Sequence, residues 1–246
     1  IEGMTGSQAR RFADFDDQVA HSLLEYAGRV SRRGFVSNTL GNIAIRVRHP
    51  RDPAHGIVYT KHLGVSLEEM TIDNVIVTDI ESGELLHGSV RPSIGHLMSR
   101  TLFRLRPDIG AVMHLHVDEL IAWFSVSAQR HFRFVSADAA LVLAKPVWIL
   151  EPNVNVETDA SLLPEFADRT NCIVMPNHGV TTMGWDVSEA YHRLTTVTAE
   201  VRRILLGLQV KSLQPLTVKL GTVVEAVGFA DFDHFLPVLQ DAVFRE

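Results

Sequence analysis

The sequence predicts a mixed α/β domain built on a largely antiparallel or mixed β-sheet. Segments with apolar residues at helical spacing alternate with short segments in which every second residue is apolar, so helices and strands are interleaved along the chain. Some neighbouring strands are separated only by a short turn, which is typical of antiparallel hairpins. Together these patterns favour a sheet covered by helices over an all-helical or all-β architecture.

The composition fits one globular unit. The chain has 246 residues, of which 46% are hydrophobic and 21% charged, enough for a sizeable core. It shows no internal repeat, low-complexity tract or linker, so we treat residues 1–246 as a single domain. Ile1, Glu2 and Gly3 before Met4 look like a cloning remnant.

Charge and cysteine content exclude several classes of function. A net charge of −6 gives no reason to expect a nucleic-acid or membrane-surface partner. No apolar run reaches the length of about 18 residues that a membrane span needs. The single Cys172 rules out an internal disulfide framework and a cysteine-rich metal site, and a reducing cytoplasmic setting is the expectation.

The N-terminal half contains one long helix and two pairs of strands. Residues 8–33 carry apolar side chains at the helical period. Residues 42–47 alternate Ile, Ile and Val with other residues and predict a strand, and 56–60 predict a second. Residues 74–88 contain two apolar runs around the turn sequence ESGE and predict a hairpin.

Two further helices are expected in this half. Ser66 and Glu69 have the spacing of a capping box, so a short helix is predicted to begin there. Residues 93–105 predict an amphipathic helix that ends at the sequence RPD. Its expected apolar face consists of Ile94, Leu97, Leu102 and Leu105.

The C-terminal half alternates strands and helices. Residues 110–117 predict a buried strand, followed at once by an apolar helix. Residues 140–150 are expected to include a strand, and 172–185 to form a strand, a loop and a strand. Residues 186–208 predict a long helix, whereas 211–246 are ambiguous and fit one or two strands and a short helix.

Two histidines in the sequence MHLHV (residues 113–117) raise the question of function. Side chains at positions i and i+2 of a strand point to the same side, which places His114 and His116 about 6–7 Å apart along the backbone. Two neutral imidazoles so placed can bind one divalent ion. The alternative is a pair of hydrogen-bonded histidines at a strand end.

A third histidine strengthens the metal hypothesis. His178 lies in the sequence PNHGV after an apolar strand, beside Gly179, where the backbone can adopt positive φ and aim the loop into a cleft. Three imidazoles with an open coordination position are typical of a catalytic metal site.

The order of these motifs resembles the class II aldolase/adducin head domain family over about residues 10–210. The matching segments are GNIAIR (41–46), GVSLEEMT (64–71), RPS (91–93), RPDIGAVMHLHV (106–117) and NHGVTTMGWDVSEAYHR (177–193). The resemblance implies a three-layer α/β/α fold with a mainly antiparallel central sheet. It also implies a divalent metal, Mn or Zn, held by His114, His116 and His178. A homo-oligomer, commonly a tetramer with sites at subunit boundaries, is implied as well.

The sequence departs from the family's aldolases at three positions. The aldolases carry an acid/base glutamate nineteen residues before the first histidine of the H-x-H motif, and here that position is Gly95. A phosphate-contacting serine is replaced by Ile94, and the Ser or Thr before a pocket glycine by Leu63. We therefore expect a pocket that lacks the carboxylate and is more apolar than a sugar-phosphate site.

The remaining matches to the family's anion-binding positions are the predicted substrate-binding residues, Thr39, Gly41, Asn42 and Ser93. A pocket with fewer donors suits a small-molecule carboxylate on a flat ring better than a phosphate dianion. Lys61, His62 and His131 are weaker candidates for a second carboxylate, and each is expected to lie at the surface.

The resulting hypothesis is a metal-dependent carbon–carbon lyase that decarboxylates a hydroxylated aromatic or heteroaromatic acid through a metal-stabilised enolate or phenolate. His96, next to the vacant glutamate position, is the candidate proton donor, the alternative being a polar residue on an amphipathic helix. The alternatives to decarboxylation are an aldolase and a non-catalytic, adducin-like assembly module. Because adducin-type members typically lose the three histidines, their presence here favours an enzyme.

Overall fold

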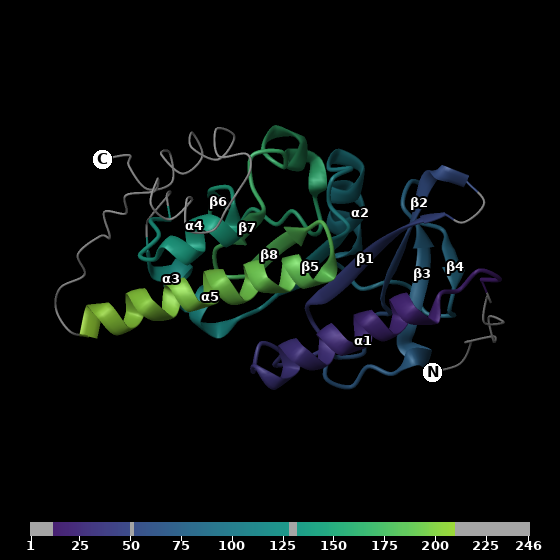
Figure 1. Ribbon diagram of the computed structural model, residues 1–246, viewed down its shortest axis with the longest axis horizontal. Coiled ribbons are helices and arrows are strands. Elements are labelled where there is room, and N and C mark those ends of the chain that lie inside the picture. Colours follow the sequence, from purple (N-terminus) through teal and green to yellow (C-terminus); the bar gives the residue numbers. More distant parts are fainter. Residues whose placement is uncertain (1–11, 50–51, 128–131, 210–246) are drawn as a thin grey trace.

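A single eight-stranded sheet organises the chain, as the computed structural model shows for residues 12–49, 52–127 and 132–209. The strand order is β4-β3-β2-β1-β5-β8-β7-β6 (Figure 1). The strands are β1 (Asn42–His49), β2 (Asp52–Lys61), β3 (Val75–Asp79), β4 (Leu85–His87), β5 (Ala111–Leu115), β6 (Val147–Ile149), β7 (Cys172–Met175) and β8 (Gly179–Gly184). Every neighbouring pair is antiparallel except β6 and β7, which confirms the expected mainly antiparallel sheet.

Helices cover both faces of this sheet, so the molecule has the three layers that the resemblance implied (Figure 1). The helices are α1 (Asp17–Arg32), α2 (His96–Leu105), α3 (Asp118–Val126), α4 (Ala137–Leu143) and α5 (Val187–Gln209), with 3₁₀ helices η1 (Ile72–Asn74) and η2 (Ala160–Glu165). One apolar core joins α1, α3, α4 and α5 to the sheet, and a second joins α2 and η2 to the opposite face.

The central strand β5 divides its side chains between the two cores. Ala111, Met113 and Leu115 belong to the core under α1 and α5. Val112 belongs to the core under α2, and because side chains alternate along a strand, His114 faces that side as well. All five residues of β5 are buried, so the histidine sits in the interior and not on an exposed edge.

Helix α1 begins later than the apolar pattern of residues 8–33 suggested. The Asp16 carboxylate caps it by accepting hydrogen bonds from the backbone N–H groups of Gln18 (2.8 Å) and Val19 (3.3 Å). The Asp16 N–H itself donates to the Tyr59 hydroxyl (2.7 Å), which ties the helix start to β2. A cap of this kind stabilises a helix at one particular residue, which apolar spacing alone does not identify.

The predicted helix at Ser66 is wrong, although its capping box forms. The Glu69 N–H donates to Ser66 Oγ (3.2 Å), and the Ser66 N–H lies 3.4 Å from Glu69 Oε2. The chain nevertheless makes only a turn at residues 67–69. Val65, Ser66 and Leu67 are all buried, and three consecutive buried residues do not fit one face of a surface helix.

The apolar face predicted for α2 is correct at Leu102 but wrong at Leu97 and Leu105. The buried apolar residues of the helix are Met98, Leu102 and Phe103, whereas Leu97 is 41% exposed and Leu105 37% exposed. Ile94 precedes the helix, which begins only at His96. Packing of Met98, Leu102 and Phe103 against the sheet decides which side of the helix is buried.

The C-terminal half follows the predicted order. The strand expected within residues 140–150 is β6, preceded by α4, and the strand, loop and strand expected at 172–185 are β7 and β8. The long helix α5 begins where expected, with the Glu189 N–H donating to Asp186 Oδ1 (2.7 Å). The assignments for residues 1–3 and 211–246 lie outside the described residues.

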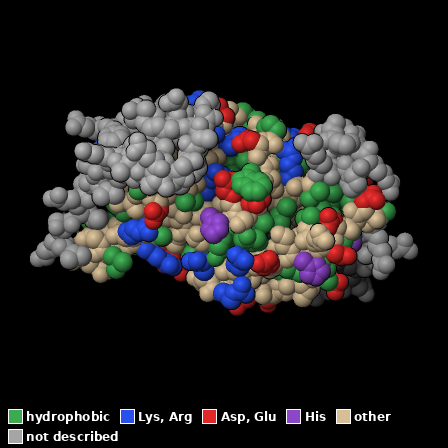
Figure 2. Space-filling model, in the orientation of Figure 1, with side chains coloured by type: hydrophobic (Ala, Val, Ile, Leu, Met, Phe, Trp, Pro, Cys, Tyr) green, Lys and Arg blue, Asp and Glu red, His purple; other side chains and the backbone are tan. Residues whose placement is uncertain are grey.

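The described helices include none long and apolar enough to cross a membrane. On the face in Figure 2, Lys and Arg side chains gather over α5 and the C-terminal end of α1. Several of these are paired with carboxylates, for example Arg29 with Glu25 (2.6 Å) and Arg202 with Glu119 (2.7 Å). The pairing neutralises part of the positive charge that an anionic surface would need.

The packing of α1 on the sheet predicts a contrast between two leucines. Leu23 is fully buried in the core under α1, whereas Leu206 on α5 is 61% exposed. We expect Leu23→Ala to lower the free energy of unfolding by about 2–5 kcal/mol, because it leaves a cavity. The same change at Leu206 should cost about 0.5 kcal/mol or less. Urea denaturation of both variants measures this, and equal losses would contradict the packing described here.

Candidate metal-binding site

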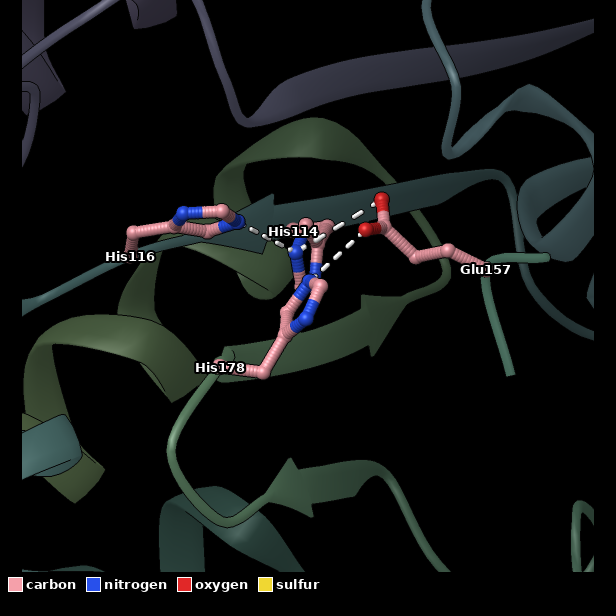
Figure 3. A group of neighbouring side chains, drawn as sticks. All are labelled: His114, His116, Glu157 and His178. Carbon is pink, nitrogen blue, oxygen red and sulfur yellow. Dashed lines mark hydrogen bonds and ion pairs between the residues drawn. The ribbon is translucent and has the colours of Figure 1, made fainter. Parts of the chain in front are cut away.

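Three imidazole rings meet at one end of the central strands (Figure 3). His114 lies in β5, His116 just beyond its end, and His178 in the loop between β7 and β8. The ring centroids are 5.0 Å apart for His114 and His116, 5.2 Å for His114 and His178, and 4.9 Å for His116 and His178. The structure therefore brings together the three histidines that the sequence singled out.

Strand pairing explains why the loop carrying His178 reaches β5. Leu115 pairs with Val180 in the β5–β8 register, so the residues before β8 lie beside the end of β5. The positive φ expected at Gly179 occurs instead at Asn177, whose φ is 61°. Gly179 is needed for space, because a Cβ there would lie 2.7 Å from the Leu115 carbonyl oxygen and 3.0 Å from His116 Cδ2.

A hydroxyl group orients the ring of His114. Thr181 Oγ1 lies 2.9 Å from His114 Nδ1 and 3.6 Å from the Met98 sulfur. The other ring nitrogen, Nε2, faces the cluster, 3.0 Å from His116 Nε2. A partner that orients the ring from behind is characteristic of metal-ligating histidines.

Burial keeps two of these imidazoles neutral. His114 is fully buried, which lowers its pKa from 6.5 to about 3. Burial, together with the nearby His178 ring, also lowers the pKa of His116. The neutral imidazole is the form that donates a lone pair to a metal, so His114 and His116 carry the charge state that a metal ligand requires.

A carboxylate that sequence reasoning missed completes the cluster. Glu157 extends from the segment between β6 and η2 and is 7% exposed. Its Oε2 accepts a hydrogen bond from His178 Nε2 (2.7 Å), and its Oε1 lies 3.6 Å from His114 Nε2 (Figure 3). Burial raises the pKa of Glu157, but the hydrogen bond from His178 and the nearby imidazoles outweigh this and hold it below its ordinary value.

The expectation that the pocket lacks a carboxylate is therefore wrong. Position 95 is glycine, but a Cβ built there would lie only 2.2 Å from Glu157 Oε1. Glu157 thus occupies the volume into which a side chain at residue 95 would project. The sequence offered no spacing signal for this, because Glu157 lies in an irregular segment far from each of the three histidines along the chain.

The donor set fits a divalent cation. One possible ligand atom from each of four residues lies within 4.8 Å of the others. Those residues are His114, His116, Glu157 and His178. Zn–N bonds of about 2.0–2.1 Å place tetrahedral donors about 3.3 Å apart, close to the 3.0 Å between His114 Nε2 and His116 Nε2. Imidazole and carboxylate ligands accept Zn, Mn, Co and Fe, so the donors alone do not select one metal.

A pocket of about 250 Å³ opens beside the cluster and is lined by His116, Glu157 and His178. All four predicted substrate-binding residues also line it: Thr39, Gly41, Asn42 and Ser93. Asn42 pairs directly with His114 in the sheet, which places its amide next to the imidazoles. Ser93 Oγ is buried and has no hydrogen-bond partner among the described residues, so it is available to a ligand.

The rim of the pocket is apolar. Leu40 is 47% exposed, Ile94 is 56% exposed, and both line the opening together with Leu63. Ile94 and Leu63 are the two replacements noted in the sequence, and the structure places both at the pocket. Exposed aliphatic side chains beside buried polar groups are typical of a site that binds a partly apolar molecule.

Lys61 does not lie at the surface as expected. It is 1% exposed, and its Nζ donates to the carbonyl oxygens of Thr39 and Val65, both at 2.8 Å. Burial lowers its pKa to about 8. Lys61 therefore holds together the two loops that form the rim. His131 lies outside the described residues.

The geometry does not support His96 as the proton donor. His96 is 7% exposed, does not line the pocket, and places its Nε2 3.0 Å from Thr78 Oγ1. Burial, with a smaller contribution from Arg100, lowers its pKa to about 4, so the ring is neutral near pH 7. As the first residue of α2, its side chain turns toward β3, away from the pocket reached by its neighbours at 93–95.

Comparisons with known proteins identify the family. The chain belongs to the family of the Class II Aldolase and Adducin N-terminal domain, whose sequence model matches residues 21–204. This confirms the resemblance inferred from the motifs.

The chain is similar to L-ribulose-5-phosphate 4-epimerase UlaF of Salmonella paratyphi B, with 26% identity over 183 residues, 70% of this chain and 77% of the relative. UlaF of Salmonella typhi matches to the same extent. Among solved structures, L-fuculose 1-phosphate aldolase has a TM-score of 0.71 and 18% identity, covering 87% of this chain and 98% of that chain. A sugar-phosphate aldolase from Thermotoga maritima has a TM-score of 0.71 and 16% identity, covering 81% and 99%. At these identities the structural likeness shows the fold.

Burial of His96 predicts a pH-dependent stability. The unfolded chain takes up a proton at this residue below about pH 6.5, whereas the folded protein does so only near its pKa of about 4. The stabilising contribution is therefore complete above pH 6.5 and is lost as the pH falls toward 4, by up to about 3 kcal/mol. We expect the unfolding free energy of His96→Gln to change less over this range. Urea titrations of both proteins at pH 7 and pH 4 test this. Equal losses of unfolding free energy in the two proteins would contradict the lowered pKa of His96.

Proposed function

We propose that the protein is a divalent-metal-dependent carbon–carbon lyase acting on a small hydroxylated substrate. The convergence of the three imidazoles beside a pocket carries this proposal. In it, His114, His116 and His178 hold the ion. When bound, such an ion supplies Lewis-acid chemistry that stabilises the negative charge left on carbon when a carbon–carbon bond breaks.

The residues around the cluster have separate roles in binding. The unpartnered Ser93 hydroxyl and the Asn42 amide are positioned to hydrogen-bond polar groups of the substrate. Leu40, Leu63 and Ile94 contact its apolar part and exclude water from the opening. Lys61 positions the two loops that carry these groups. Together they hold one end of a small molecule against the cluster.

Glu157 favours retro-aldol cleavage as the reaction. Cleavage of this kind requires removal of a proton from a substrate hydroxyl, and a carboxylate oxygen of Glu157 at the pocket wall can accept it. The low pKa of Glu157 keeps it in the ionised form that a base needs. The names of the relatives, a ribulose-phosphate epimerase and aldolases of sugar phosphates, agree with chemistry of this class.

Decarboxylation of a hydroxylated aromatic or heteroaromatic acid is the second candidate, and the apolar rim favours it. Ile94 and Leu63 stand where donors to a phosphate would be expected, and a flat ring would pack against them. Glu157 removes the other reason for preferring this reaction, which was the apparent absence of a carboxylate. A non-catalytic assembly module is disfavoured, because a scaffold gains nothing from an ionised carboxylate buried beside three histidines. The homo-oligomer implied by the resemblance remains part of the proposal.

The metal assignment makes a direct prediction. His114→Ala and His178→Ala should each abolish stoichiometric binding of Zn²⁺ or Mn²⁺ and, with it, turnover. His192→Ala removes an exposed histidine on α5 outside the cluster and should leave binding unchanged. Metal content after dialysis, measured by mass spectrometry, tests this. Retention of one equivalent of metal by both cluster variants would exclude the proposed site.

The two candidate reactions release different products. We expect the metal-loaded protein to release an aldehyde from hydroxyketone or hydroxy-acid substrates, detected with a coupled dehydrogenase. Release of CO₂ from a panel of hydroxyaryl and hydroxyheteroaryl carboxylates would support decarboxylation instead. Neither product from either panel, with metal bound, would count against a lyase.

A further inference from the structure

The identity of residue 95 is explained by space and not by backbone conformation. Gly95 has φ −68° and ψ 3°, values that any L-amino acid adopts, and it caps α2 without a side-chain hydrogen bond. A Cβ at this residue, however, would lie 2.2 Å from Glu157 Oε1 and 2.3 Å from Asn42 Nδ2. Both distances are shorter than 3.0 Å, and Cβ atoms in proteins essentially never come that close to another heavy atom. Residue 95 therefore has no room for a side chain while Glu157 is in place.

The charge of Glu157 has no Lys or Arg beside it. Within the described part of the chain, its carboxylate lies 2.7 Å from His178 Nε2 and 3.6 Å from His114 Nε2 and forms no ion pair with a Lys or Arg side chain. Burial of a carboxylate is costly unless a cation compensates it. A divalent ion among the imidazoles would supply that charge.

The loop that carries Glu157 is built to present it. The Glu157 N–H donates to Asn155 Oδ1 (2.9 Å), which closes a tight turn immediately before the carboxylate. Asn155 Nδ2 lies 3.5 Å from His178 Nδ1, so the same side chain contacts the far side of a predicted ligand. His178 is thus contacted by Asn155 at one ring nitrogen and by Glu157 at the other.

We propose that Glu157 is the carboxylate ligand of the metal ion before substrate binds, and that residues 95 and 157 are an exchangeable pair that fills one carboxylate position from either of two loops. This inference rests on the metal site of the proposed function. It adds that the carboxylate implied at residue 95 by the aldolase resemblance has been replaced, not lost. Gly95 is then required because Glu157 is present.

The first test compares two glutamates. Glu157→Gln keeps the size of the side chain and removes its charge, and we expect it to weaken Zn²⁺ or Co²⁺ binding by about tenfold or more. It should also alter the visible absorption spectrum of the Co²⁺ protein, which reports the ligands directly. Glu165→Gln on the exposed side of η2 removes the same charge outside the cluster and should change neither. Unchanged affinity and spectrum in Glu157→Gln would overturn the inference.

The second test exchanges the two residues. Glu157→Gly should weaken metal binding, and Gly95→Ala should weaken it as well, because the added methyl group displaces Glu157. In the Glu157→Gly background, Gly95→Ala should cause little further loss, since the carboxylate is already absent and only the end of the Asn42 side chain has to move. The exchange Gly95→Glu with Glu157→Gly should restore affinity to within about threefold of the natural protein. An exchange variant that binds as weakly as Glu157→Gly, or a Gly95→Ala variant that binds normally, would overturn the exchangeable pair.

The outcomes separate the two levels of the hypothesis. If the natural protein binds no divalent ion, the proposed function fails and the ligand role fails with it. If the natural protein and Glu157→Gln bind equally well while His114→Ala does not, the histidine site stands and only the role of Glu157 is rejected. Circular dichroism of each variant identifies any loss of metal binding that is caused by misfolding. If other variants misfold, the result for Glu157→Gln, which is closest in shape to the natural side chain, decides between the outcomes.

Discussion

The antiparallel pairing of β5 with β8 is the constraint on which the site depends. It places Thr181 opposite His114, where its hydroxyl orients the imidazole ring, and it brings the loop with His178 to the end of β5. Both strands are buried along their whole length. A slip of one residue would turn His114 into the opposite core and separate it from His178. The same strand pairing therefore stabilises the central sheet and positions the histidines of the site.

Around this rigid centre, the pocket is assembled from irregular segments whose positions are less constrained. Glu157 reaches the histidines from the loop before η2 and occupies the volume into which a side chain at residue 95, at the start of α2, would project. The same freedom places Leu63 and Ile94 at the rim, with the buried ammonium of Lys61 joining the loops beneath them. A fixed set of imidazoles combined with variable loops lets one fold bind different substrates.

Much of the fold was readable from local patterns, and the errors share a cause. Strand β1 follows period-two apolar spacing and helix α5 follows helical spacing, because each buries one face, whereas β3 and β7 carry uninterrupted apolar runs of the kind found in buried strands. The buried side of α2 was predicted only in part. The helix begins at His96, and its packing against the sheet, which local spacing does not reveal, decides which side chains face inward. The segment at Ser66 forms a capping box but no helix, because Val65 and Leu67 are buried together with the residue between them and the capping residues alone do not determine the backbone conformation.

The sequence by itself indicated the fold class and the three histidines, because two of them lie two residues apart at the end of a predicted strand and the third lies beside a glycine in a predicted loop. It also identified Thr39, Gly41, Asn42 and Ser93, which all reach the pocket. Only the tertiary structure decided that Glu157 joins the histidines, that Lys61 is buried and that His96 faces away. The physical reason is that these three outcomes depend on which segments, distant along the chain, pack against one another, and the spacing of residues within a segment does not reveal this.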